Sequence, residues 1–258
     1  QGLSGQAMTA KVSDHINQFT NKELKKYATS HFIPYSITCP IELDWFPSDT
    51  LEHFLTTSKE HQGYWNQQPP IKYSLNKYGF RSDEFSEEEC RESITFIGCS
   101  NTVGIGIHKE DTWPARVAKE LNLREINLGI CAGSTDSAFR VYNEWQPIHK
   151  SKITCFLLPP TNRMEIVDRG GNWLNIGHWS TKVEWLSDQM LVSLLDDTLN
   201  EVRVDRNTAA IKHIANETDS KLIILPYIEK PDLARDNLHG GKNTHKNMAK
   251  NFLEEINK

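Results

Sequence analysis

The sequence lacks any apolar run long enough to cross a membrane. Its longest such runs, residues 153–158 and 222–225, have the length of strands and fall far short of the ~20 residues that a bilayer requires. Residues 1–10 also lack the basic segment followed by an apolar segment that marks a secretory signal peptide. We therefore expect no membrane partner and a cytoplasmic location.

Positive charge is also scarce. The 258 residues include 29 Lys and Arg against 34 Asp and Glu, a formal net charge of −5, and no basic run is longer than Lys25-Lys26. Proteins that bind nucleic acid electrostatically need a basic stripe to neutralise phosphates. We therefore expect no nucleic-acid partner. The 38% of hydrophobic residues suffices for a packed core and excludes disorder as the overall state.

Cysteine is sparse and poorly spaced for disulfide or metal chemistry. The five cysteines form no C-x-x-C pair, and they are Cys39, Cys90, Cys99, Cys131 and Cys155. Most of them lie in apolar, strand-like contexts, which indicates reduced thiols. His239 and His245 have no Cys or carboxylate cluster spaced to complete a metal shell with them. We expect no metal site, and we expect His245 to pack against or cap the last helix.

Several familiar catalytic and nucleotide-binding motifs are absent as well. The sequence contains no G-x-S-x-G nucleophile elbow, no H-E-x-x-H, no P-loop and no G-x-G-x-x-G. These absences disfavour an ordinary α/β-hydrolase, a zinc protease, an NTPase and a dinucleotide-dependent enzyme. We expect no cofactor.

From residue 94 onward, short apolar runs that end at Gly or Pro alternate with longer helical segments. This alternation is typical of a parallel α/β sheet. The predicted strands are 94–97, 124–130, 153–158 and 222–225. The predicted helices are 112–121, 134–145, two within 183–215 with a break near 198–207, and 244–256. The predicted fold class is α/β, a flavodoxin-like doubly wound parallel sheet with helices on both faces in three α/β/α layers.

Residues 1–90 do not show this alternation and are rich in aromatic residues and proline, as at 32–34, 45–47 and 67–70. We expect them to form an irregular N-terminal extension that packs on a body made of residues 91–258. Residues 1–7 resemble a scar left by protease cleavage, with Met8 as the candidate native start.

Four polar segments follow the four predicted strands, and Ser100, Asn162, Asp236 and His239 lie in three of them. In a doubly wound sheet, ligands bind at the carboxyl ends of the strands, so these segments should meet at one edge. Ser100 lies in a Gly-rich turn, where its hydroxyl and backbone N–H can face the same space. His239 is the candidate base that takes the proton of this hydroxyl, and Asp236, one turn away, can orient the imidazole.

Each of these features also has an ordinary structural explanation. A serine in a Gly-rich turn is usually a cap or turn residue, and Asp-x-x-His pairs are frequent in a chain with ten histidines. Asn162 is equally compatible with an Asx-turn. The catalytic interpretation depends on all three segments following separate strands. Backbone N–H groups near Gly133 and the Asn162 carboxamide are then candidates to stabilise an oxyanion.

Two of these segments resemble motifs of a known family, the GDSL or SGNH hydrolases. Residues 98–104, GCSNTVG, resemble its G-D-S-x-T-x-G block, and residues 236–239, DNLH, resemble its terminal D-x-x-H block. Residues 127–135 are similar to the second block, and residues 76–81 to a segment that often precedes this domain in bacterial and phage members. The resemblance implies that Ser100 is the nucleophile, that His239 is the base and that Asp236 orients this base. It also implies three oxyanion donors, which are the Ser100 N–H, the Gly133 N–H and the Asn162 side chain.

The sequence departs from the family pattern in each of the first three blocks. Cys99 replaces the Asp of the first block, a residue that proton transfer does not need. The second block is one residue longer than usual, which leaves Gly129, Ala132 and Gly133 as alternative donors. The third block should read G-x-N-D, whereas residues 160–163 read PTNR, so only the Asn is kept.

The segment after the third strand brings Arg163, Trp173 and Trp179 toward the same edge. Aromatic faces stack on sugars and Arg binds carboxylates, so these side chains predict a sugar substrate, acidic sugars included. The alternative is a surface loop whose Trp residues close the core.

The leading functional hypothesis is a serine esterase that hydrolyses a small-molecule or carbohydrate ester, such as an O-acetyl or other short acyl group, through an acyl-enzyme. The alternatives are an acyltransferase to a sugar hydroxyl and a non-catalytic binding or structural module that retains the fold.

Overall fold

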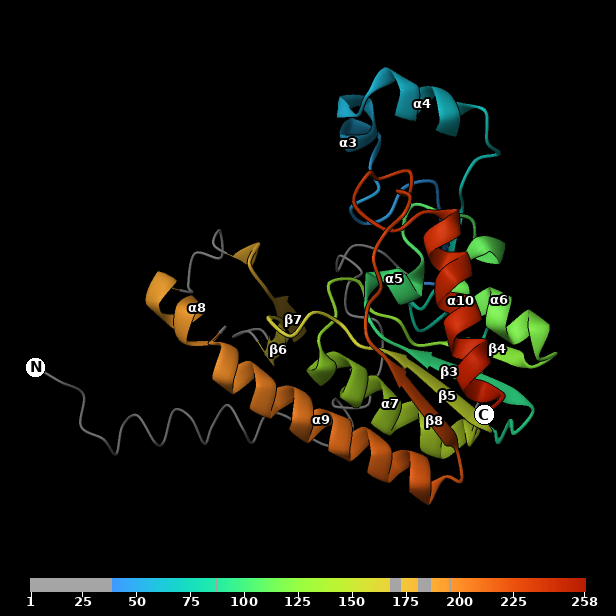
Figure 1. Ribbon diagram of the computed structural model, residues 1–258, viewed down its shortest axis with the longest axis vertical. Helices are drawn as coiled ribbons and strands as arrows, with labels where there is room; N and C mark the ends of the chain where they lie inside the picture. Colours follow the sequence, from blue (N-terminus) through green and yellow to red (C-terminus); the bar gives the residue numbers. More distant parts are fainter. Residues whose placement is uncertain (1–38, 87, 168–172, 181–186, 195) are drawn as a thin grey trace, which may run out of the picture.

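Figure 1 shows the chain as a computed structural model that describes residues 39–86, 88–167, 173–180, 187–194 and 196–258. The candidate start Met8, the rest of residues 1–38, and residues 183–186 at the beginning of the expected helical stretch lie outside the described residues. Within the described ranges, no helix is long and apolar enough to cross a bilayer.

A four-stranded parallel sheet forms the centre of the molecule. Its strands are β3 (Ser93–Ile97), β4 (Arg124–Asn127), β5 (Ile153–Leu157) and β8 (Lys221–Leu225), in the order β4-β3-β5-β8. In register, Phe96 of β3 pairs with Asn127 of β4 and with Cys155 of β5. All four predicted strands are present, and the order is that of a doubly wound sheet, which confirms the predicted fold class.

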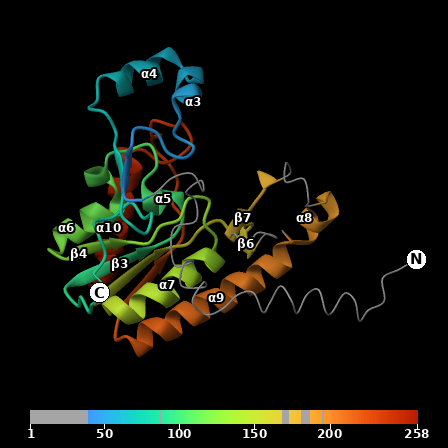
Figure 2. The same ribbon diagram turned by 180° about the vertical axis from the view of Figure 1, so that it is seen from behind.

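Helices cover both faces of this sheet. Helices α7 (Thr135–His149) and α9 (Asp197–Glu217) lie on one face, and α6 (Trp113–Glu120) and α10 (Lys242–Ile256) lie on the other (Figures 1 and 2). Alternate strand residues face the two layers, as the pleat requires. The first core includes Ile97, Phe156, Val141, Trp145 and Ile211, and the second includes Phe96, Cys155, Trp113, Met248 and Phe252.

The helix starts follow the capping signals of the sequence. The Thr112 hydroxyl accepts a hydrogen bond from the Ala115 N–H at 3.3 Å, directly after the short 3-10 helix η2 (Lys109–Asp111), and Pro114 lies in the first turn of α6. Ser134 and Ser137 form a capping box at the start of α7. The helices predicted at 112–121, 134–145 and 244–256 are confirmed, and α7 extends four residues further than expected.

The second strand is shorter than predicted. Strand β4 ends at Asn127 instead of residue 130. The Asn127 side-chain Oδ1 accepts a hydrogen bond from the Gly129 N–H at 3.0 Å, which turns the chain at this point. Residues 128–130 therefore belong to the loop at the carboxyl edge of the sheet.

The helix break predicted near 198–207 is wrong. Helix α8 (Asp188–Leu194) ends before Asp196, whose side chain accepts from the Leu199 N–H and caps α9. Helix α9 then continues through the predicted break. Asn207, a weak helix former, is held there because its carboxamide donates to Thr135 and Asp136 of α7 at 3.1 and 2.7 Å.

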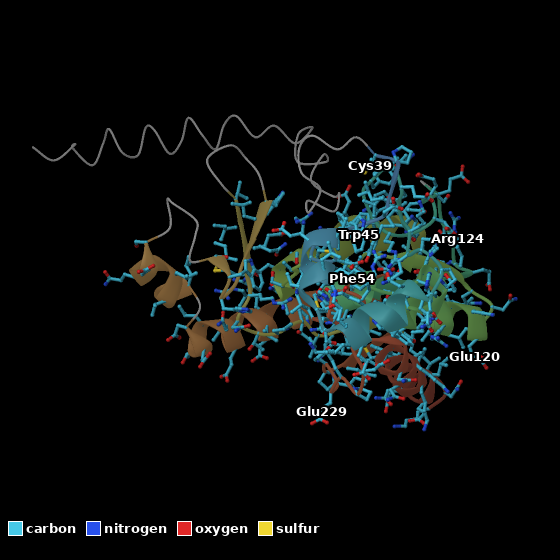
Figure 3. The ribbon with its side chains drawn as sticks, turned by 90° about the horizontal axis from the view of Figure 1, so that it is seen from above. Cys39, Trp45, Phe54, Glu120, Arg124 and Glu229 are labelled. Carbon is cyan, nitrogen blue, oxygen red and sulfur yellow. The ribbon has the colours of Figure 1, made fainter. Side chains whose placement is uncertain are left out.

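The described part of the N-terminal extension contains regular elements. Strands β1 (Ile41–Leu43) and β2 (Tyr73–Leu75) pair antiparallel, and helices α3 (Leu51–Thr56) and α4 (Lys59–Asn66) lie between them in the chain. Figure 3 shows Trp45 and Phe54 of this segment close together, with ring centroids 6.0 Å apart. A buried cluster joins its apolar residues to those of the body, and it includes Phe46, Phe54, Trp65, Tyr73, Val103, Ile105 and Ala234.

The segment between β5 and α9 forms a separate small core. Strands β6 (Met164–Val167) and β7 (Trp173–Ile176) pair antiparallel, and Ile176 and Leu191 of α8 are buried together. This hairpin and α8 lie beside the beginning of α9, whereas α3 and α4 lie above α5 (Ser100–Val103) in the views of Figures 1 and 2.

Candidate active site

Ser100 begins a single helical turn, α5, directly after β3. The turn depends on two glycines with positive φ, Gly98 at 153° and Gly104 at 79°. A Cβ on Gly98 would lie 2.3 Å from the Thr102 Oγ1 and 2.8 Å from the Leu157 carbonyl oxygen, so only glycine fits there. These glycines let the chain reverse tightly enough to hold Ser100 at the carboxyl end of the central strand.

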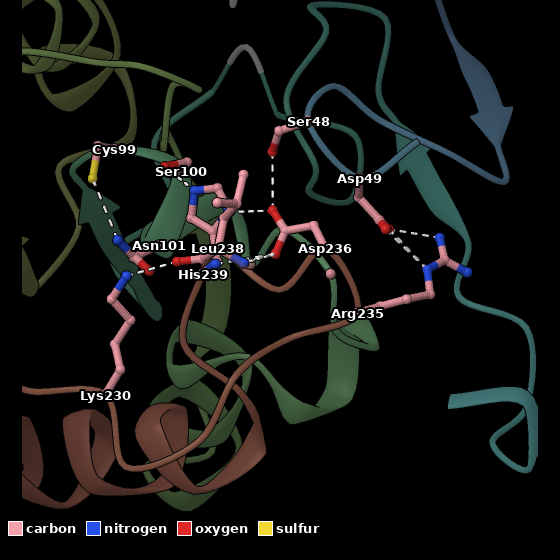
Figure 4. Close-up of polar contacts among 12 residues, drawn as sticks. Ser48, Asp49, Cys99, Ser100, Asn101, Lys230, Arg235, Asp236, Leu238 and His239 are labelled. Atoms are coloured by element: carbon pink, nitrogen blue, oxygen red, sulfur yellow. Dashed lines mark hydrogen bonds and ion pairs between the residues drawn. The ribbon is translucent and has the colours of Figure 1, made fainter. Parts of the chain in front are cut away.

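Three predicted catalytic side chains meet in one chain of hydrogen bonds (Figure 4). The Ser100 Oγ lies 2.7 Å from the His239 Nε2, and the His239 Nδ1 lies 2.5 Å from the Asp236 Oδ2. Asp236 is fully buried, and the His239 side chain is 17% exposed. A His239 that donates from Nδ1 to the carboxylate presents Nε2 as an acceptor for the Ser100 hydroxyl.

Asp236 is held in its charged form by its hydrogen bonds. Burial by itself raises the pKa of this carboxyl, but the His239 side chain and the backbone N–H groups of Leu238 and His239 all lower it, and the net pKa lies below the ordinary value. The two N–H groups donate to Oδ1 at 3.1 and 3.0 Å, on the oxygen that does not meet the imidazole. Asp236 therefore carries negative charge beside His239 at neutral pH.

The loop after β4 contains the alternative oxyanion donors. The Gly133 N–H donates to the Ile130 carbonyl at 3.0 Å, and the Gly129 N–H donates to the Asn127 side chain at 3.0 Å. Both amides are therefore engaged within their own loop. Among the described residues, the Ala132 N–H has no acceptor, and Ala132 has a left-handed φ of 57°. Of the three, Ala132 is the one whose amide has no acceptor among the described residues, and the identity of the donor remains a prediction.

Asn162 lies five residues beyond the end of β5, and its side chain is exposed. No hydrogen bond joins its carboxamide to Ser100 or His239. Its part in an oxyanion hole remains a prediction.

The three predicted substrate-binding residues lie in or near the β6–β7 hairpin. The Arg163 guanidinium lies 5.0 Å from the ring centroid of Trp179, and the Arg140 guanidinium of α7 lies 5.0 Å from that of Trp173. Each Trp ring thus has a cation over one face. Neither Trp belongs to the small core formed by the hairpin and α8, and the role of these residues in substrate binding remains a prediction.

Sequence reasoning missed two contacts between the N-terminal extension and the loop of residues 235–239, which carries Asp236 and His239 and is called the catalytic loop below. The Ser48 Oγ donates to the Asp236 Oδ2 at 3.0 Å. Next to it, Asp49 and Arg235 form a buried ion pair, with 2.6 Å between the Asp49 Oδ2 and the Arg235 Nη2. The partners lie 186 to 188 positions apart in the sequence, and no motif links them. The only local signal is that Arg235 immediately precedes the D-x-x-H block.

His245 is fully buried in α10, in line with the packing alternative, and it does not cap that helix. Its Nδ1 accepts a hydrogen bond from the Trp113 backbone N–H at 3.0 Å, so it serves the beginning of α6 instead. Burial lowers the pKa of His245 to about 3, which keeps the ring neutral and able to accept. Within the described part of the chain, no cluster of His, Cys, Asp and Glu side chains is arranged to hold a metal ion.

No protein-family model and no curated protein sequence matches the chain. Among solved structures, it is similar to a psychrotrophic esterase from Pseudoalteromonas sp., with 12% identity and a TM-score of 0.35 over 64% of this chain and 97% of that one. It is also similar to an acetylxylan esterase from Geobacillus stearothermophilus, with 16% identity and a TM-score of 0.33 over 66% and 96% of the two chains. A third structure, described as a lipolytic protein of the G-D-S-L family from Desulfitobacterium hafniense, has 11% identity and a TM-score of 0.30 over 62% and 96%. Identities and TM-scores this low assign no role to any residue, so each role is inferred from the geometry of this chain alone.

Proposed function

We propose that the protein is a serine ester hydrolase that works through an acyl-enzyme. The observation that supports this most strongly is the unbroken hydrogen-bond chain from the Ser100 hydroxyl through His239 to Asp236, at the edge of the sheet where ligands bind in this fold class. A module that had lost catalysis would have no need to keep a base 2.7 Å from a serine hydroxyl.

The proposed reaction has two halves. The Ser100 oxygen attacks the ester carbonyl while the His239 Nε2 takes its proton, and Asp236 stabilises the imidazolium that forms. His239 then gives this proton to the leaving alcohol, which departs as the acyl-enzyme forms. In the second half, His239 takes a proton from water as the water attacks the acyl group, and it returns the proton to the Ser100 oxygen when the acid leaves.

The negative charge on the carbonyl oxygen needs donors that are fixed before the reaction. We assign the backbone N–H groups of Ser100 and Ala132 and the carboxamide of Asn162 to this role. The two amides have no acceptor among the described residues, so they are available to a ligand.

Asn162→Ala should lower kcat on the order of 10²–10³-fold, because one oxyanion donor typically contributes that much. The KM should change little, since the charge that Asn162 would stabilise exists only in the transition state. Steady-state kinetics on a soluble ester measure both constants. A rise in KM with kcat unchanged would assign Asn162 to substrate binding instead.

The pH profile follows from the base. A protonated His239 cannot accept the Ser100 proton, so kcat/KM should fall toward acidic pH. The pKa of Asp236 is lowered, so this carboxyl adds no second limb near neutral pH. Rates measured from pH 5 to 8 with an uncharged ester would contradict the proposal if they were flat.

The finer proposal is that the substrate is an O-acetyl or other short acyl ester of a carbohydrate. The aromatic and Arg side chains of the β6–β7 hairpin suit a sugar, acidic sugars included. Hydrolysis of p-nitrophenyl acetate, butyrate and octanoate tests the reaction and the acyl length, and acetylated xylo-oligosaccharides test the alcohol. Mass analysis of the products, with free sugar added as an acceptor, separates release of the acid from transfer to a sugar hydroxyl.

A further inference from the structure

The buried carboxylate of the catalytic loop has two side-chain donors on the same oxygen. The Asp236 Oδ2 accepts from the His239 Nδ1 and also from the Ser48 Oγ, at 2.5 and 3.0 Å (Figure 4). We propose that Ser48 is a positioning residue for the catalytic triad, supplied by the N-terminal extension. This inference rests on the proposed esterase function, and it adds a fourth side chain to the Ser100–His239–Asp236 chain.

Ser48 completes the set of bonds that fixes the orientation of the carboxylate. The Oδ1 of Asp236 accepts from the Leu238 and His239 backbone N–H groups, which belong to the same loop. Without Ser48, the one remaining side-chain donor to Oδ2 among the described residues is the His239 Nδ1, and the charge of that ring changes as Nε2 takes and gives up a proton. A donor from outside the loop therefore holds Oδ2 in place while His239 exchanges its proton.

Ser48 is itself held by the residue beside it. The Asp49 carboxylate is fully buried and accepts from the Arg235 Nε and Nη2, and from the Tyr73 hydroxyl at 2.5 Å. The Trp45 ring lies 3.9 Å from the Arg235 guanidinium. Two neighbouring residues of the extension thus pair with two neighbouring residues of the catalytic loop, and this double contact sets the distance between Ser48 and Asp236.

The same network continues to the turn that holds the nucleophile. The Tyr73 hydroxyl accepts from the Gly106 N–H at 2.8 Å, and the Arg235 N–H donates to the Gly106 carbonyl at 2.9 Å. Gly106 follows α5 by three residues, so the extension contacts both segments that contribute to the triad. The extension is therefore part of the active site and not only a cover over the body.

The test compares Ser48→Ala and Ser48→Thr with the unchanged full-length chain. Ser48→Ala should lower kcat about tenfold and leave KM within about twofold, because the lost bond orients a catalytic group and touches no substrate. Ser48→Thr keeps the hydroxyl and should recover most of the lost kcat. The rate constant for labelling by a fluorophosphonate should fall in parallel with kcat, since it reports how readily Ser100 is activated.

Ser74→Ala is the matched control. Ser74 belongs to the same extension, and its hydroxyl also donates to a carboxylate, Glu42, at 3.4 Å, but it is exposed on the β1–β2 pair. This variant should keep the kinetics of the unchanged chain, and all three variants should keep its melting temperature within about 3 °C.

Each outcome decides between two separate claims. If Ser48→Ala matches the unchanged chain in kcat and labelling rate while Ser100→Ala is inactive, the esterase function stands and the role of Ser48 is overturned. A parallel loss in Ser48→Ala and Ser48→Thr, without rescue, would also overturn it, because the hydroxyl would then not be the cause. If the unchanged chain neither hydrolyses esters nor reacts with the fluorophosphonate, the proposed function itself fails, and the inference fails with it.

Discussion

Ser100→Ala is expected to leave the protein folded and to lower kcat/KM for ester hydrolysis by at least about 10⁴-fold. The Ser100 Oγ is the atom that becomes bonded to the acyl group, so no neighbouring side chain can replace it in the same mechanism. The side chain is small and makes its one described side-chain hydrogen bond to His239, so its loss removes little packing. Initial rates with p-nitrophenyl acetate measure the loss, and circular dichroism with thermal melting checks the fold.

The residual rate has a physical lower limit. The oxyanion donors and the bound substrate geometry persist in Ser100→Ala, so catalysis by water attack can remain well above the uncatalysed rate. Ser74→Ala controls for the effects of substitution and purification. It removes an exposed hydroxyl that donates to Glu42 and not to Asp236. A folded Ser100→Ala that keeps more than about a tenth of the activity would contradict the triad.

Asp49→Asn is expected to lower the free energy of unfolding by about 3–5 kcal/mol, because it leaves a buried guanidinium without its counter-charge. Asp49 is fully buried, and the Arg235 side chain that it pairs with is 10% exposed. The substitution nearly preserves shape, so the loss is electrostatic and not a cavity. Urea or guanidinium denaturation at pH 7 measures the change.

A second Asp→Asn change in the same extension provides the control. Asp44 pairs with Lys72 at 2.7 Å, but both side chains are about half exposed or more, at 62% and 49%. Solvent screens such pairs, so Asp44→Asn should cost far less stability than Asp49→Asn. Equal losses in the two variants would show that burial of the Asp49–Arg235 pair does not matter.

The sheet and its covering helices could be predicted because their signals are local. The run at 153–158 is continuous and apolar, as a strand buried on both faces must be, and Thr112 with Pro114 marks a helix start within three residues. The meeting of Ser100, His239 and Asp236 followed from one rule of topology, that the carboxyl ends of parallel strands share an edge. The roles of these residues remain predictions that the experiments above test.

The misses have non-local causes. The break predicted near 198–207 does not form, because hydrogen bonds to α7 hold Asn207 inside the helix. Ser48 and Arg235 meet partners 186 or more positions away, and a single sequence carries no spacing that reveals such pairs.

The most direct test of the central claim is to locate the covalent adduct of a fluorophosphonate by peptide mass spectrometry. The proposed mechanism predicts one adduct per chain, on Ser100, formed at a rate that falls at acidic pH as His239 is protonated. It also predicts that His239→Ala reacts at least about 100-fold more slowly, since the base that activates the hydroxyl is gone. Modification of another serine, such as Ser134, or no modification of the native protein, would contradict the assignment of Ser100 as the nucleophile.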